Sequence, residues 1–188
     1  MGVQKIRILS EIPPRLLQRE FGKYGTMLWK RANAIDNPPI IPYAEQKSIS
    51  AERTFQVDTI DMVLLKSELT KLVMQLAFQL REQQKLTACI TIKIRYTDFN
   101  TYTLQKRIPH TANDEFLLQL AQQLFDKLYH RRQLLRLIGV KFSHLIIGNY
   151  QTRLFEDTET DMQLLQTMDD IRKRFGKQAI MRASALKK

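Results

Sequence analysis

The feature that most constrains the fold is a change of hydrophobic period along residues 47–147. A period of two residues is typical of a strand with one buried face, whereas a period near 3.6 indicates an amphipathic helix. The two periods follow one another here in the order strand, helix, strand, strand, helix, strand. The six segments so predicted are 47–55, 61–83, 86–97, 101–108, 113–128 and 134–146.

The strictest alternation lies in residues 86–97, where apolar side chains from Leu86 to Tyr96 alternate with mostly polar ones. Asp98-Phe99-Asn100 indicates a hairpin turn before the next strand, which Pro109 is expected to end. Two helices with one apolar stripe each need a common apolar surface, and a four-stranded antiparallel sheet supplies it. The sequence therefore predicts an α+β fold, a ferredoxin-like sandwich with both helices on one face of the sheet.

Three further parts flank this domain. Residues 13–33 contain two short helices that meet at a glycine corner, Gly22–Gly25, where a positive φ is available. Residues 34–46 contain three prolines and no regular period, which indicates an extended tether. Residues 162–175 have helical spacing, and they fit equally a helix that docks on another protein and one folded back on the domain. The predicted division is a helical segment over 1–36, a linker over 37–46, the domain over 47–147 and a tail over 148–188.

Charge is unevenly distributed over the predicted sheet. The chain has a formal net charge of +11, and residues 46–147 contain 15 basic and 9 acidic side chains. Most of these acids fall on the helices, and Glu52 is the one acid that could share the opposite sheet face. Lys and Arg among Ser, Thr and Gln, without exposed aromatics, suit contacts to phosphate and sugar. This face is predicted to contain Ser48, Ser50, Thr91, Lys93, Arg95, Thr103, Gln105, Arg107, Lys141 and Ser143.

Composition disfavours several other classes of protein. Cys89 is the only cysteine, so no intramolecular disulfide or thiolate metal cage can form, and a reducing cytoplasm is the expected setting. No apolar run approaches the roughly 20 residues that span a bilayer. The acids at 157, 159, 161, 169 and 170 and the three histidines lack the grouping of a catalytic site. We expect no catalytic residue, no metal ligand and no membrane partner in this chain.

Three stretches carry a resemblance to a known family: Phe21–Asp36, Lys47–Phe55 and Leu137–Ser143. In order and spacing they resemble the C-terminal half of bacterial Y-family translesion DNA polymerases, the group that includes DNA polymerase IV. The resemblance covers nearly all of residues 3–147. It implies that residues 1–36 are the remnant of a helical thumb and that 47–147 are the little finger, a DNA-binding domain typical of the family.

The resemblance also implies roles for individual residues. The glycine corner would offer N–H groups to phosphates, and the sheet would hold the backbone of primer-template duplex across its major groove. The Mg²⁺ ions of nucleotidyl transfer would be held by carboxylates of the family's palm domain upstream, so this fragment is expected to be inactive and without a cofactor. It is also expected to be monomeric. Ala34 stands where glycine is common in the family. The implied DNA contacts are Gly22, Lys23, Gly25, Lys47, Ser48, Ser50, Arg53, Thr91, Lys93, Arg95, Thr103, Gln105, Arg107, Lys141 and Ser143.

The segment Gln151-Thr152-Arg153-Leu154-Phe155 resembles the short peptide with which bacterial polymerases dock on the sliding clamp. Two adjacent apolar side chains in a polar tail have no evident core to join, so a groove on another protein is a reasonable destination. Gln151, Leu154 and Phe155 are the predicted contacts. The sliding clamp is therefore the second expected partner, beside double-stranded DNA.

Two other functions fit the same pattern of elements. Free-standing RNA-recognition modules share the order of strands and helices, but they stack bases on exposed aromatics of their central strands. Here Phe55, Tyr96 and Phe142 fall in the inward register or at strand ends. A protein-interaction scaffold, or a basic sheet that is merely solvated, would show no salt-dependent affinity for DNA.

Overall fold

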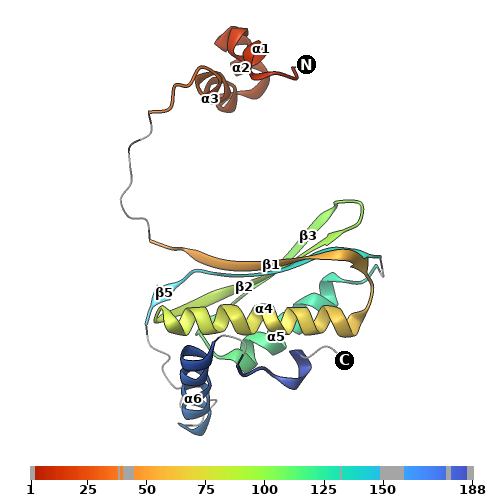
Figure 1. Ribbon diagram of the computed structural model, residues 1–188, viewed down its shortest axis with the longest axis vertical. Coiled ribbons are helices and arrows are strands. Elements are labelled where there is room, and N and C mark those ends of the chain that lie inside the picture. The colour runs from red at the N-terminus through yellow and green to blue at the C-terminus, as the bar shows by residue number, and fades with distance from the viewer. Residues whose placement is uncertain are drawn as a thin grey trace. The chain divides into compact units, whose positions relative to one another are not determined.

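The computed structural model describes residues 3–37, 39, 45–131, 133–148, 159–176 and 179–185. The chain forms two compact units, Met1–Ala44 and Glu45–Lys188 (Figure 1), and each is described by itself.

The first unit contains three short helices, α1 (Ile6–Glu11), α2 (Pro14–Phe21) and α3 (Lys23–Ala32). Pro14 lies in the first turn of α2, where its missing N–H leaves no hydrogen bond unmade. The sequence predicted α2 and α3. It did not predict α1, which has no capping side chain and no buried residue to mark it.

The corner between α2 and α3 depends on two glycines. Gly22 has a φ of +58°, in the left-handed region that favours glycine. Leu17 of α2 is fully buried, and a Cβ at Gly25 would collide with the Leu17 carbonyl group. Gly25 therefore allows the two helices to approach closely. Ala34, just after α3, also has a positive φ of +57°, at the position where the resembling family commonly has glycine.

The second unit is built on an antiparallel sheet with the strand order β1-β4-β2-β3. Each crossover helix joins two strands that have a third strand between them: α4 connects β1 to β2 around β4, and α5 connects β3 to β4 around β2. A short fifth strand, β5 (Ile146–Ile147), pairs with the start of β2. The order of elements confirms the α+β, ferredoxin-like prediction. The bounds are β1 (Ser48–Thr59), α4 (Met62–Glu82), β2 (Lys85–Tyr96), β3 (Thr101–Thr111), α5 (Asp114–Leu128) and β4 (Leu135–Ser143).

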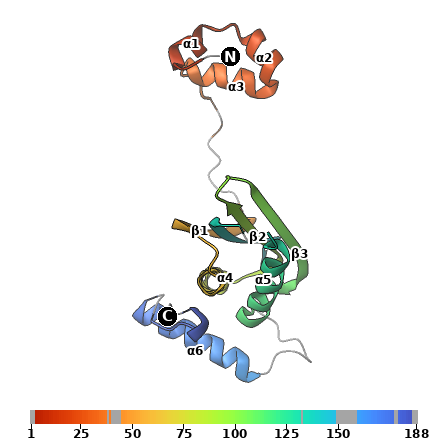
Figure 2. The same ribbon diagram turned by 90° about the vertical axis from the view of Figure 1, so that its right-hand side faces the viewer.

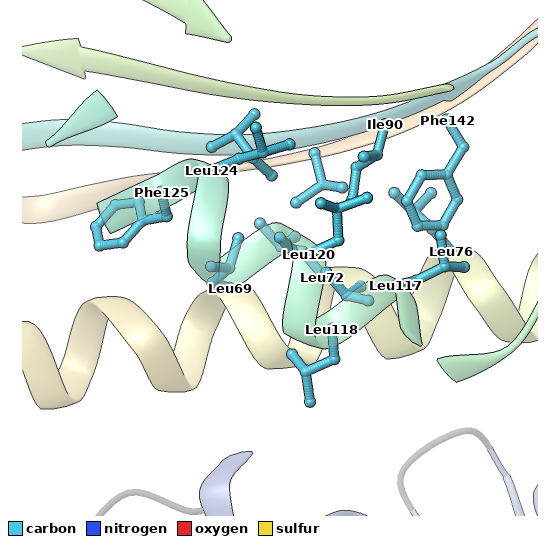
Figure 3. Close-up of a cluster of buried hydrophobic side chains, with 14 of the residues drawn as sticks. Leu69, Leu72, Leu76, Ile90, Leu117, Leu118, Leu120, Leu124, Phe125 and Phe142 are labelled. Carbon is cyan, nitrogen blue, oxygen red and sulfur yellow. The ribbon is translucent and has the colours of Figure 1, made fainter. Parts of the chain in front are cut away.

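Helices α4 and α5 lie side by side on one face of the sheet, and the core fills the space between them and the strands (Figures 1 and 2). Asp61 caps α4 by accepting hydrogen bonds from the N–H groups of Val63 and Leu64, at 2.9 and 3.2 Å. Asn113 caps α5 in the same way. Figure 3 shows the packed side chains, among which Leu69, Leu72, Leu76, Ile90, Leu117, Leu120, Leu124, Phe125 and Phe142 are buried.

Two strands run further than the sequence predicted, because irregularities in pairing accommodate their ends. Strand β1 continues to Thr59 through a shift of register after Thr54. Strand β3 continues past Pro109 to Thr111, so the expectation that Pro109 ends it was wrong. Its register shifts between the pairs Cys89–Arg107 and Thr87–Thr111, and Pro109 lies in that bulge.

Two C-terminal elements form a third layer beneath α4 and α5, on the side away from the sheet (Figure 2). This layer contains α6 (Glu159–Phe175) and the 3₁₀ turn η1 (Ala183–Ala185). Ser67 of α4 donates a buried hydrogen bond of 3.0 Å to the carbonyl oxygen of Ala185. Leu118 points away from the sheet in Figure 3 and is nevertheless buried. Of the two possibilities left open by the sequence, the structure shows α6 folded back on the domain.

A nearly buried ion-pair network holds α6 in this position. The Arg81 guanidinium donates from Nε and Nη2 to the two carboxylate oxygens of Asp169, at 2.6 and 2.9 Å. It also donates to Asp114 at the start of α5. Burial lowers the pKa of Arg81, but its hydrogen bonds and charge interactions with Asp169 and Asp114 outweigh burial and raise that pKa above its ordinary value. Arg81 is therefore a fixed cation that joins α4, α5 and α6.

We expect Asp169→Ala to release α6 from the domain, because it leaves the charge of Arg81 largely buried and short of a partner. The loss of α6 docking should be about 3 kcal/mol, as for other broken buried pairs. Hydrogen exchange of the amides of residues 163–176 measures it directly. The adjacent Asp170 is exposed and is the matched control, since Asp170→Ala should change protection by less than about 0.5 kcal/mol. Unchanged protection in Asp169→Ala would show that the network does not hold the helix.

Candidate nucleic-acid interface

The sheet face opposite the helices is organised into four rows that each cross all four strands. Residues paired across antiparallel strands project to the same side, so the strand register decides which side chains share this face. We call it the outer face. Its rows, in the order β1, β4, β2, β3, are Ser48–Ser143–Cys89–Arg107, Ser50–Lys141–Thr91–Gln105, Glu52–Gly139–Lys93–Thr103 and Thr54–Leu137–Arg95–Thr101.

All ten residues that the sequence assigned to one sheet face fall in these rows. The rows contain four basic side chains and one acidic side chain, Glu52, and they contain no aromatic residue. Across the part of the chain that the structure describes, Arg107 and Lys141 make no ion pair, and both are exposed. Arg95 donates from Nε to the Thr101 hydroxyl at 2.9 Å. The outer face thus carries at least three cations that no carboxylate neutralises.

Not every residue of the outer face is exposed to solvent. Cys89 is only 1% exposed and Leu137 only 6% exposed, although both belong to its rows. They lie on the two central strands, where longer neighbouring side chains can cover small or apolar ones. The expectation of one buried and one exposed face for residues 86–97 was therefore wrong at Cys89, and also at Thr87, which is fully buried.

Arg53 does not belong to the outer face. Its row also contains Ile138, Ile94 and Tyr102, which face the helices. Its guanidinium Nε lies 3.9 Å from a carboxylate oxygen of Glu68 on α4. Because side chains alternate along a strand, Arg53 projects to the same side as Ile49 and Ala51, and the sequence did not assign it to the outer face. Its role as a DNA contact stays a prediction. Lys47 is exposed and directly precedes β1.

Glu52 and Lys93 form an ion pair across the middle of the outer face. Lys93 Nζ lies 2.9 and 3.2 Å from the two carboxylate oxygens of Glu52. The residue between them in the same row is Gly139 on β4. A Cβ at position 139 would lie 2.9 Å from Glu52 Cγ, so glycine leaves the space through which the two side chains meet. The sequence indicated Glu52 as the one acid on this face but not its partner, which depends on the register of three strands.

The glycine corner of the first unit contributes fewer free N–H groups than predicted. The Gly25 N–H donates to the Gly22 carbonyl at 3.0 Å, and Gly25 is buried against α2. It is therefore a packing residue, and its expected role as a phosphate donor is corrected. Gly22 and Lys23 are exposed at the start of α3, which has no side-chain cap. The helix N-terminus carries partial positive charge, so these two positions remain predicted phosphate contacts.

The tail was predicted to contain a clamp-binding peptide, and the chain to have no metal ligand and no membrane partner. Gln151, Leu154 and Phe155 lie outside the described residues, so the predicted clamp peptide stays a prediction. Within the described ranges, no group of three His, Cys, Asp or Glu side chains could hold a metal ion. In the same ranges no helix has the length and apolar character needed to cross a membrane.

Comparison with known proteins identifies the class to which this fold belongs. Residues 46–174 match the family model described as the impB/mucB/samB family C-terminal domain. A Y-family DNA polymerase chimera of known structure has a similar fold, with a TM-score of 0.50 and 22% identity over 78% of this chain and 42% of that one. The family model thus places residues 46–174 in this class of C-terminal domain, and their fold is the one found in the Y-family polymerase chimera.

The chain belongs to the impB/mucB/samB family. It is 32% identical over 193 residues to the DNA polymerase IV of Clostridium acetobutylicum. The aligned region covers 100% of this chain and 48% of that protein. The DNA polymerase IV of Dehalococcoides mccartyi is 32% identical over 178 residues, or 94% of this chain and 46% of that protein. The chain spans about half the length of the curated relatives it matches.

Proposed function

We propose that this chain grips primer-template duplex DNA for a lesion-bypass DNA polymerase and tethers that enzyme to its sliding clamp. The observation that carries the first part is the segregation of charge. The outer face has four basic side chains and a single acid, while the helices on the other side carry most of the acids of the domain. Such a face attracts a polyanion and leaves most of the acids of the domain away from it.

The expected mode of binding is contact with the DNA backbone. Lys and Arg release condensed counterions when they meet phosphates, and Ser, Thr and Gln donate hydrogen bonds to phosphate and sugar oxygens. Arg107 and Arg95 lie in the first and fourth rows, six residues apart along the partner strand β2, which corresponds to about 20 Å. A face of this length is wide enough to reach phosphates on both sides of a major groove about 12 Å across. Binding should therefore depend little on sequence.

Chemistry would be supplied by other parts of the enzyme. Template-directed nucleotidyl transfer needs Mg²⁺ ions held by carboxylates, and the described residues contain no cluster that fits such an ion. The role of this chain in the reaction is to position the duplex. As a part of a DNA repair enzyme it is expected to act in the cytoplasm.

RNA recognition is supported less well than duplex binding. Modules of that kind use aromatic platforms on the central strands, whereas Tyr96 and Phe142 are buried on the helix side of this sheet. The rows of the outer face offer bases no ring on which to stack. The most exposed aromatic near the sheet, Phe99, is in the hairpin turn and carries the Arg136 guanidinium 4.8 Å from its ring centre.

The triple variant Arg95→Gln, Arg107→Gln, Lys141→Gln should lose duplex affinity on the order of 100-fold near 0.15 M salt, because three phosphate contacts disappear. The slope of log K against log salt should become shallower by about 2.7. Fluorescence anisotropy with a labelled duplex measures both quantities.

The matched control replaces three lysines of the helical layers, Lys66, Lys127 and Lys173, by glutamine. It removes the same formal charge but should reduce affinity only a few-fold. If both triple variants weaken binding equally, net charge rather than the outer face is responsible.

The clamp-binding prediction has its own test, since it rests on the sequence alone. The double variant Leu154→Ala, Phe155→Ala should abolish association with the sliding clamp in calorimetry, because the two apolar side chains are the expected anchors. Duplex affinity of the same variant should be unchanged. Clamp affinity equal to that of the unmodified chain would exclude this peptide as the tether.

A further inference from the structure

We propose that Glu52 limits the grip of the outer face on duplex DNA by holding Lys93 away from phosphate. This inference rests on the proposed function, because it assigns a regulator to the same face. Glu52 acts on the strength of the contact and on the ease with which the duplex moves across the sheet.

The two partners of this ion pair lie on strands that are not adjacent. Glu52 is on β1 and Lys93 on β2, with the whole of β4 between them. Two strand spacings place the two backbones about 9 to 10 Å apart. Even so, Lys93 Nζ lies 2.9 Å from Glu52 Oε1, because both side chains lean over Gly139. Lys93 is thereby drawn along the sheet toward β1, whereas a phosphate contact requires it to extend away from the sheet.

The pair leaves an electrically neutral row between two positive ones. Lys141 lies in the row before it and Arg95 in the row after it. Those two rows are four residues apart on β2, which corresponds to about 13 Å, close to the width of the major groove. Phosphates of the two DNA strands would then meet the rows of Lys141 and Arg95. The neutral row of Glu52 and Lys93 would face the groove between the two DNA strands.

Release of Lys93 from Glu52 would add one phosphate contact. The pair is partly exposed, with side-chain exposures of 29% for Lys93 and 41% for Glu52, and pairs of this kind exchange partners readily. In the unmodified chain, Glu52 competes with phosphate for the same ammonium group. A polymerase must advance along the duplex at every nucleotide added, so a contact that is weak at the centre of the sheet favours movement.

The test is a double-mutant cycle on the full chain, with duplex affinity measured at several salt concentrations. Glu52→Gln preserves the shape of the side chain and frees the Lys93 ammonium. It should tighten binding about three- to ten-fold near 0.15 M salt and steepen the salt slope by about 0.9, the value for one added phosphate contact. In the Lys93→Gln background, the same Glu52→Gln change should tighten binding less than two-fold.

Asp126→Asn is the matched control, because Asp126 pairs with Lys66 at 3.1 Å on the helical side and its loss changes the net charge equally. It should alter duplex affinity less than two-fold. If Glu52→Gln leaves affinity unchanged, or tightens binding equally with Gln at position 93, the inference is overturned while duplex binding stands. If the unmodified chain shows no salt-dependent duplex binding, both the inference and the proposed function are overturned.

Discussion

The alternation of side chains across the four-stranded sheet is the constraint on which both the hydrophobic core and the outer face depend. A shift of one residue in the register of β2 would turn Ile90, Ile92 and Ile94 to solvent and bury Lys93 and Arg95. The hydrophobic core beneath α4 and α5 therefore also fixes the arrangement of cations on the outer face. Stability and the proposed DNA contact are encoded in the same strands, on opposite sides.

A second constraint lies on the side away from the proposed interface. Arg81 connects α4 to the start of α5 and to α6, and its carboxylate partners keep it charged although it is mostly buried. Residues 179–185 are secured as well, through the pair between Arg182 and Glu115 and the hydrogen bond from Ser67 to Ala185. Helix α6 and residues 179–185 thus belong to the domain as a third layer.

Local patterns were enough to predict most of the fold. The period of 3.6 residues located α4 and α5, and the strict alternation of residues 86–97 located β2. The same alternation puts Arg53 on the helix side, since it shares parity with Ile49, and the predicted sheet face did not include it. Pro109 misled the prediction because a bulge removes its residue from the ladder without ending the strand. The Glu52–Lys93 pair and the Arg81–Asp169 pair could not be predicted, because each joins elements whose relative position depends on the whole packed domain.

The central claim is that the outer face binds the backbone of duplex DNA. The most direct measurement is a competition titration of this chain with a duplex that has a single-stranded overhang and with single-stranded RNA, repeated at several salt concentrations. The account predicts preference for the duplex, little dependence on its sequence, and steep weakening of affinity as salt rises. Preference for single-stranded RNA, or duplex affinity that does not change with salt, would contradict it.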